Sequence, residues 1–314
     1  HAEFINNLHE IKNIFLFFKI NTSKQIEYQI MNMSSVLKNM FHKNNTIALF
    51  NGSNNANYEQ LIKINNLYED VKIKNLSEVN NGLAVFNTKK LKLLFDITKP
   101  SSKLLSKNLH SGTLSFEMSY DNEKIITNCG SIERRIGRKP EYLRLSAAHS
   151  TIIVNNTNIS ELVEKKSYKR IPQNITFHKK EDKEIIFCES SHDGYKENFK
   201  KIVKRKLSIY KNKPSIKGKD SIISLNQNSK NIFYNIRFHL TPGCSCLLTN
   251  NKKSVLIKTD LNNSWIFNSK SKLTLEDSIY IYDGKRINKT KQIVISGLIS
   301  STRIIEEWHI YKIN

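Results

Sequence analysis

The sequence lacks the residue patterns that mark the commonest catalytic and metal sites. It has no glycine-rich phosphate loop, no H-E-x-x-H helix, no G-x-S-x-G elbow and no paired C-x-x-C motif. These absences exclude the usual nucleotide-binding, zinc-protease and esterase assignments. Four cysteines in 314 residues fit neither a dense disulfide framework nor a paired zinc motif. Cys244 and Cys246 are two residues apart, so in a strand they would share one face and pack there.

Long apolar runs are missing as well. The longest one, residues 14–18, is cut off by Lys19 and is far shorter than the roughly 20 residues of a membrane-spanning helix. The chain begins with His1, and no charged region, apolar run and small-residue cleavage site follow in order. We therefore expect no membrane span, and a signal peptide that is either absent or already removed.

Acidic residues are scarce relative to basic ones. The chain has 28 Asp and Glu against 50 Lys and Arg, which gives a net charge of +22. Such an excess attracts polyanions, including nucleic acid, anionic lipid and acidic polysaccharide. The basic residues are scattered along the chain, however, and Lys, Asn and Ile are abundant throughout, as expected from an AT-rich genome. Codon bias and solubility therefore explain the charge as well as a polyanionic partner does.

The hydrophobic pattern changes its period at about residue 80. Residues 1–43 repeat apolar side chains at three- and four-residue spacing, which predicts two helices, and a shorter helix is predicted at 58–62. After residue 80, segments rich in β-branched and aromatic residues recur at intervals of roughly ten residues. They are 113–120, 124–129, 151–155, 183–188, 233–240, 254–259, 273–281 and 292–299. Since no helical pattern separates them, they predict a mainly β fold with a large antiparallel sandwich.

Polar residues gather in and around two neighbouring predicted strands. The group consists of Asn108, His110, Asn128, Arg144 and His149. A basic connection between them, with Arg134, Arg135 and Arg138 followed by Tyr142, is of the kind that lines an anion-binding cleft. Each of these residues also has a structural reading, as a buried imidazole bonded to the backbone, a paired guanidinium or a solvated face.

Several blocks resemble one known family. Residues 108–117, NLHSGTLSFE, resemble the H-x-H-x-D-x-x-S-F-E segment of heparinase II/III-like proteins, with Gly112 in place of its Asp. Residues 125–130 resemble that family's apolar strand ending in D-x-G, and residues 147–154 resemble its A-H-N-T-L-x-V block. Further blocks at 191–195, 236–243 and 276–280 are similar to the same sandwich domain. The order and spacing of the blocks hold from about Gly82 to the end of the chain.

The resemblance implies an α/α toroid followed by a large β-sandwich, with a substrate cleft between them. Residues 1–65 would be the last toroid helices, and residues 66–314 the sandwich domain. The implied activity is cleavage of an acidic, uronate-containing polysaccharide by β-elimination, in the cell envelope, the periplasm or outside the cell. This chemistry needs a group that neutralises the uronate carboxylate, a base for the C5 proton and an acid for the leaving oxygen.

The resemblance also assigns catalytic and substrate-binding roles. The first His of H-x-H is a catalytic residue in the family, and Asn108 holds that position here. Asn can bond a carboxylate but cannot shuttle a proton, so proton transfer would fall to His110 or to a Tyr, with Tyr142 as the local candidate. The candidate substrate-binding residues are Arg134, Arg135, Arg138 and Arg144.

Metal binding is a further expectation from the family. Its metal-binding members use three side chains that correspond to His110, Asn128 and His149. Asn128 replaces the only anionic ligand, and a neutral amide is a poor zinc ligand. We therefore expect no required cofactor and keep a structural zinc ion as an alternative.

Two other functions stay open. Asn108 and Asn128 would permit a catalytically inactive module that still binds an anionic glycan. Nucleic-acid binding by charge alone is the second alternative, but the sequence has no recognition helix or stacking pattern to support it. The expected partner is therefore an acidic polysaccharide and not a specific nucleic acid.

Overall fold

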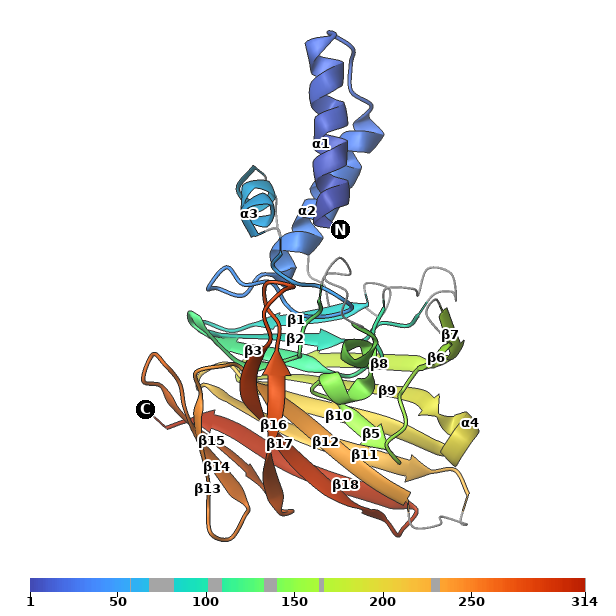
Figure 1. Ribbon diagram of the computed structural model, residues 1–314, viewed down its shortest axis with the longest axis vertical. Helices are drawn as coiled ribbons and strands as arrows, with labels where there is room; N and C mark the ends of the chain where they lie inside the picture. The colour runs from blue at the N-terminus through green and yellow to red at the C-terminus, as the bar shows by residue number, and fades with distance from the viewer. Residues whose placement is uncertain are drawn as a thin grey trace.

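The computed structural model describes residues 1–56, 58–67, 82–100, 109–132, 140–163, 167–226 and 232–313. Three helices come first, α1 (Ala2–Phe17), α2 (Lys24–Met40) and α3 (Tyr58–Leu67), as the apolar spacing predicts. They stand off one end of a β-sandwich (Figure 1). The hydroxyl of Ser23 accepts the Gln25 N–H at the start of α2, which satisfies a free donor of the first turn. Phe17 is 80% exposed, so the helices leave apolar surface uncovered.

The first sheet has the strand order β1-β2-β3-β4-β12-β17-β16, with β5 paired to β12. Its strands are β1 (Leu83–Asn87), β2 (Leu91–Asp96), β3 (Phe116–Tyr120), β4 (Glu123–Thr127), β5 (Ile152–Val154), β12 (Ile232–Leu240), β16 (Leu273–Tyr280) and β17 (Asn288–Ile299). All named pairings are antiparallel. The predicted fold class, a mainly β antiparallel sandwich preceded by a few helices, is confirmed.

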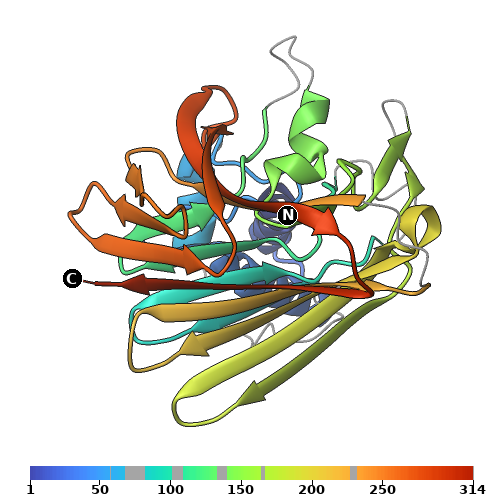
Figure 2. The same ribbon diagram turned by 90° about the horizontal axis from the view of Figure 1, so that it is seen from below.

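The second sheet has the order β13-β14-β15-β18-β11-β10-β9-β8. Its strands are β8 (Ile175–Glu181), β9 (Ile185–Tyr195), β10 (Lys201–Tyr210), β11 (Ser215–Ser224), β13 (Ser245–Leu248), β14 (Ser254–Lys258), β15 (Ser264–Ser269) and β18 (Arg303–Lys312). Figure 2 shows the long strands of this sheet running side by side across the molecule. The remaining elements are a hairpin of β6 (Glu161–Val163) and β7 (Ser167–Arg170), the short helix α4 (Lys196–Phe199), and the 3-10 turns η4 (Pro140–Arg144) and η5 (Ser146–Ala148).

Aromatic side chains from both sheets meet in the core. Phe116 of β3 stacks on Trp308 of β18 with ring centroids 5.5 Å apart, and Phe238 of β12 lies 4.7 Å from Phe267 of β15. All four are buried. Gly218 permits this packing, because a Cβ there would lie 2.0 Å from the Trp308 ring. The core therefore fixes how the two sheets face each other.

The segment that follows α2 is bound to the first sheet. Apolar residues of this segment and of the helices, including Leu37, Leu49 and Leu61, pack with Tyr280 of β16. None of the helices in the described ranges is long and apolar enough to cross a membrane. All four cysteines are free. The division of the chain into domains at residues 65 and 66 stays a prediction.

Candidate functional site

Two of the predicted site residues, His110 and His149, lie against each other. Their ring centroids are 5.3 Å apart and the ring planes are inclined by 63°. His149 follows η5 directly, and His110 belongs to the segment that leads into β3. The backbone N–H of His110 donates to Asn51 Oδ1 at 3.2 Å, so this segment contacts the loop that follows the helical hairpin. The imidazole pair therefore lies at the end of the sandwich that carries the helices.

Asn128, the third predicted member, is joined to the same place. Its Oδ1 accepts the backbone N–H of Ser150, the residue after His149, at 2.9 Å. Its own backbone N–H donates to Glu117 Oε1 at 3.0 Å. The Nδ2 atom is buried and has no hydrogen-bond partner among the described residues. The strand ends of β3, β4 and β5 thus bring together residues that are separated in the sequence.

Gly112 explains how the His149 ring fits here. A Cβ at residue 112 would lie 2.9 Å from His149 Cγ, which is closer than side-chain carbon atoms approach. The heparinase II/III-like segment has Asp at this position, and an aspartate could enter only if the ring moved. Glycine at residue 112 therefore leaves the space that the His149 ring occupies.

Both imidazoles are neutral at neutral pH. Burial lowers the pKa of His149 to about 4, against smaller raising effects of the Glu117 carboxylate and the Leu143 carbonyl. Burial also lowers the pKa of His110 well below its usual value, helped by His149 and Arg144. His110 Nδ1 and both ring nitrogens of His149 form no hydrogen bond of good geometry with the described residues. Each neutral ring carries one basic nitrogen lone pair, and both rings are buried.

These donors do not fit a zinc site. Two neutral imidazoles could ligate a metal, but the Asn128 oxygen already accepts the Ser150 N–H, and an amide contributes no charge. Within the described ranges, no group of three or more His, Cys, Asp or Glu side chains is placed to hold a metal ion. A structural zinc normally has four ligands, with thiolates or carboxylates among them in most sites. We therefore assign no chemical step to a metal.

The replacement Asn128→Asp tests the assignment that the neutral Asn128 amide makes this group of side chains unfit for zinc. An aspartate would restore an anionic ligand beside two free imidazoles, so we expect its zinc affinity to exceed that of the unmodified chain by about tenfold or more. Competition with a chromophoric chelator measures the affinity, and thermal unfolding checks that the variant is folded. The double variant Asn128→Asp, His149→Ala is the control and should lose the gain. Equal zinc affinity of the single variant and the unmodified chain would contradict the assignment.

Arg144 holds the segment that carries His110. Its Nε and Nη2 donate to the Leu109 carbonyl at 3.2 and 3.1 Å, and its own carbonyl accepts the Ser111 N–H at 2.8 Å. The side chain is buried. This placement gives Arg144 a positioning role, while contact with a substrate stays a prediction.

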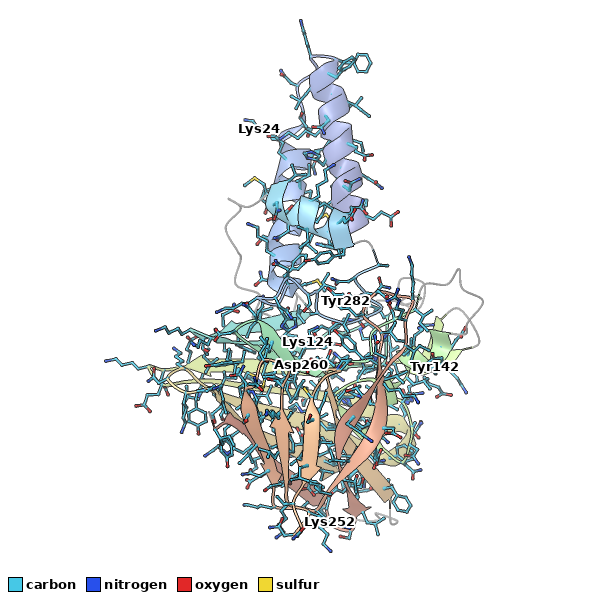
Figure 3. All side chains as sticks on the ribbon, turned by 60° about the vertical axis from the view of Figure 1, so that its left-hand side comes forward. Lys24, Lys124, Tyr142, Lys252, Asp260 and Tyr282 are labelled. Atoms are coloured by element: carbon cyan, nitrogen blue, oxygen red, sulfur yellow. The ribbon has the colours of Figure 1, made fainter. Side chains whose placement is uncertain are left out.

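Tyr142 lies apart from the imidazole pair. It is 42% exposed, and it lines a pocket of about 630 Å³ with Cys129, Ala147, His239 and Ser278. Neither His110 nor His149 lines this pocket. In Figure 3 Tyr142 lies at the side of the sandwich, below the level of the helices. The described contacts therefore do not join Tyr142 to the two histidines.

Four predicted site residues cannot be placed. Asn108, Arg134, Arg135 and Arg138 lie outside the described residues. Their catalytic and substrate-binding roles stay predictions.

The sequence did not reveal Arg205, which supports the site from the opposite sheet. Its Nη1 donates to the carbonyls of Leu114 and Ser150, both at 2.8 Å, next to the two segments that carry the histidines. Its Nε and Nη2 bind both carboxylate oxygens of Asp220 at 2.7 and 2.8 Å. Trp308 Nε1 donates to the same carboxylate at 2.9 Å. This buried network couples the core to the site.

Glu117 is the second residue that the sequence did not reveal as part of the site. Burial would raise its pKa, but Lys124 at 2.9 Å and His42 at 3.0 Å lower the pKa to about 2. Its Oε1 accepts the backbone N–H groups of Leu49 and Asn128 at 3.1 and 3.0 Å. Figure 3 shows Lys124 just below the helices. Glu117 thus ties the segment after α2 to the strand end that carries Asn128.

The chain is similar to known proteins in sequence and in structure. Residues 78–306 match the family described as Heparinase II/III-like, C-terminal. The fold is similar to that of heparan sulfate lyase HepC from Pedobacter heparinus, with a TM-score of 0.72 and 13% identity, over 99% of this chain and 51% of that chain. A heparinase III structure gives a TM-score of 0.69 and 14% identity, over 100% and 52% of the two chains. The chain spans about half the length of these structures. No curated protein sequence matches it.

Proposed function

Because the chain belongs to the heparinase II/III-like family, we propose that it is the sandwich part of a polysaccharide lyase acting on an acidic, uronate-containing glycan. The observation that carries the proposal is the pair of neutral imidazoles, His110 and His149, at the end of the sandwich next to the helices. β-Elimination needs a proton acceptor near the uronate C5, and a neutral imidazole with a free lone pair can accept a proton. We assign this role to His110.

Contacts that fix the position of His110 support the proposal. Arg144 bonds the Leu109 carbonyl, Asn51 bonds the His110 N–H, and the His149 ring limits the imidazole from one side. These contacts fix the segment before any substrate binds, which lowers the entropy cost of reaching a reactive geometry. An acidic glycan is the partner we propose, with a location in the cell envelope, the periplasm or outside the cell. The net charge of +22 favours such a partner.

One observation favours the alternative of an inactive glycan-binding module. A base becomes cationic when it accepts a proton, and the burial that lowers the pKa of His110 makes this cation unfavourable. Among the described residues no carboxylate forms an ion pair with either ring, and the raising effect of Glu117 on the pKa of His149 is smaller than the lowering effect of burial. The same chain could therefore bind the glycan without cleaving it.

Turnover of defined glycans separates the two functions. The full natural chain containing these residues would be incubated with heparan sulfate, alginate or chondroitin, and the ultraviolet absorbance of the unsaturated product followed. His110→Ala should lower turnover at least about 100-fold if His110 moves the proton. His178→Ala, at an exposed histidine of β8, is the matched control and should leave the rate unchanged. Glycan binding with no rise in absorbance in the unmodified chain would exclude the lyase and support the binding module.

A further inference from the structure

The outer face of the second sheet collects lysines that are scattered in the sequence. Successive residues of a strand point to opposite faces, so Arg205 and Leu207 of β10 face the core while Lys204 and Lys206 face outward. Lys206 pairs with Lys219 of β11, and Ser208 pairs with Lys217. Strand pairing thus brings lysines together on one face, although they do not form a continuous basic block in the sequence.

Lys206, Lys217 and Lys219 line a pocket of about 470 Å³. We call the outer surface around this pocket, together with the neighbouring Lys204, Tyr210, Lys213 and Tyr311, the basic face. The pocket is lined by residues that include Phe187, Lys206, Lys217, Lys219, Lys270 and His309. They come from β9, β10, β11, β18 and the end of β15, so the pocket spans five strands of one sheet. None of the residues described in the candidate site lines it except the edge of Trp308.

Positive charge on the basic face exceeds negative charge. Glu189 pairs with Lys204 and Lys206, and Glu307 pairs with Lys219 and Lys270. Each glutamate therefore neutralises one of two lysines. Lys213 and Lys217 have no carboxylate within 4.0 Å among the described residues, and both lie over the Tyr210 ring, at 4.5 and 5.7 Å from its centroid. Burial lowers the pKa of His309 to about 4, with smaller lowering contributions from Lys217 and Lys213.

Aromatic rings lie next to the lysine side chains of the basic face. The rings of His309 and Tyr311 lie 4.6 Å apart on β18, and Tyr210 lies under the two free lysines. Aromatic faces give apolar contact area to flat apolar groups, including the C–H faces of sugar rings. Ammonium groups beside them give ionic contacts to carboxylates and sulfates. A ligand that satisfies both has anionic groups at intervals along a chain of pyranose rings.

We infer that the basic face is a second binding surface for an acidic polysaccharide, separate from the site with His110 and His149. The inference rests on the proposed substrate class, and it adds a place where a long chain is held while another part of it lies at the candidate site. Because the second sheet lies between them, with Arg205 facing the site and Lys206 facing outward, one short oligosaccharide cannot contact both.

The double variant Lys213→Ser, Lys217→Ser tests the surface in the full natural chain. We expect affinity for long heparan sulfate chains to fall about fivefold or more, as two exposed ionic contacts allow. The matched control, Lys19→Ser, Lys24→Ser, removes the same charge around the exposed turn between α1 and α2, above the sandwich where Figure 3 labels Lys24, and should lose much less. Calorimetry at physiological salt gives the affinities. Equal losses in both variants would overturn the inference.

Tyr210→Ala and duplex DNA separate a sugar surface from charge alone. Tyr210→Ala should weaken heparan sulfate binding while DNA binding stays unchanged. If the lysine variant loses DNA and glycan affinity equally and Tyr210→Ala affects neither, the surface attracts any polyanion and the glycan assignment fails. Turnover of short oligosaccharides is read in parallel. If unmodified protein shows no turnover but the lysine and tyrosine effects remain, the lyase proposal fails and the binding surface stands.

Discussion

Replacing Asp220 by alanine is expected to destabilise the protein by about 3–5 kcal/mol, because it leaves the Arg205 guanidinium buried and unpaired. Arg205 is fully buried, and Asp220 provides the bidentate partner for its Nε and Nη2. The Trp308 Nε1–H would lose its acceptor as well. Chemical unfolding in urea, followed by tryptophan fluorescence and by circular dichroism, measures the free energy of unfolding.

The same variant should disturb the candidate site. A guanidinium without its carboxylate has no fixed orientation, so its bonds to the Leu114 and Ser150 carbonyls should weaken. Asp277→Ala is the matched control, because Asp277 forms an exposed ion pair with Lys291, and its urea midpoint should not move. If Asp220→Ala and Asp277→Ala unfold at the same urea concentration, the buried pair makes no net contribution to stability.

The sequence predicts the strands correctly where apolar residues recur in the pattern that is typical of a β-strand. The strands β3, β4, β12, β16 and β17 coincide with predicted segments, in which β-branched and aromatic residues recur between turn residues. The strands β10 and β11 were not predicted. Lysines alternate with buried residues over 203–207 of β10 and 216–220 of β11, so that the composition of both stretches looks polar. Alternation, rather than composition, was the signal that identifies them.

Of the candidate site residues, the structure brings together those whose family blocks lie close in the sequence, while their roles stay predictions. His110, Asn128 and His149 flank strands β3, β4 and β5, so the family blocks that contain them also locate them in space. Arg205 lies 55 residues beyond Ser150, on the other sheet, and only the folded structure brings it there. One signal in the sequence could have found it. The order Val203, Arg205, Leu207 places a charge in the apolar phase of a strand, where an arginine needs a buried partner.

Tyr142 shows the limit of reasoning from proximity in the sequence. It stands only seven residues before His149, yet the turn η4 directs it to the pocket beside His239 and not to the imidazole pair. Two side chains in an irregular segment have no fixed periodicity, so spacing carries little information about which of them face each other. A strand or helix between them would have made the prediction firmer.

Acid should unfold this protein at a pH where most of its carboxylates are still ionised. Burial lowers the pKa of His42 to about 4, and that of His192 and His239 to about 3. In the unfolded chain their pKa returns to about 6.5, so below that pH the unfolded state binds more protons than the folded state. The stabilisation is complete above pH 6.5 and is lost as pH falls towards 4.

The size of the effect follows from the shifts. Each pKa unit corresponds to about 1.4 kcal/mol, so three such histidines together approach the 5–15 kcal/mol that holds a typical domain folded. Asp96 acts in the opposite direction, because burial raises its pKa to about 7 and the folded state gains stability as pH falls from 7 to 4. One carboxyl group offsets about one histidine. The net expectation is cooperative unfolding between about pH 6 and 4.

Thermal midpoints measured from pH 8 to pH 4 test this expectation, and one variant identifies the groups responsible. His192 Nδ1 accepts the Gly194 N–H at 3.1 Å, and an Asn side chain can accept the same bond without titrating. His192→Asn should therefore flatten the fall of the midpoint below pH 6.5, whereas His178→Asn, at an exposed position, should not. A midpoint that stays constant down to pH 4.5 would show that the buried histidines take up protons in the folded state as readily as in the unfolded state. In that case burial would not control the acid stability of the sandwich.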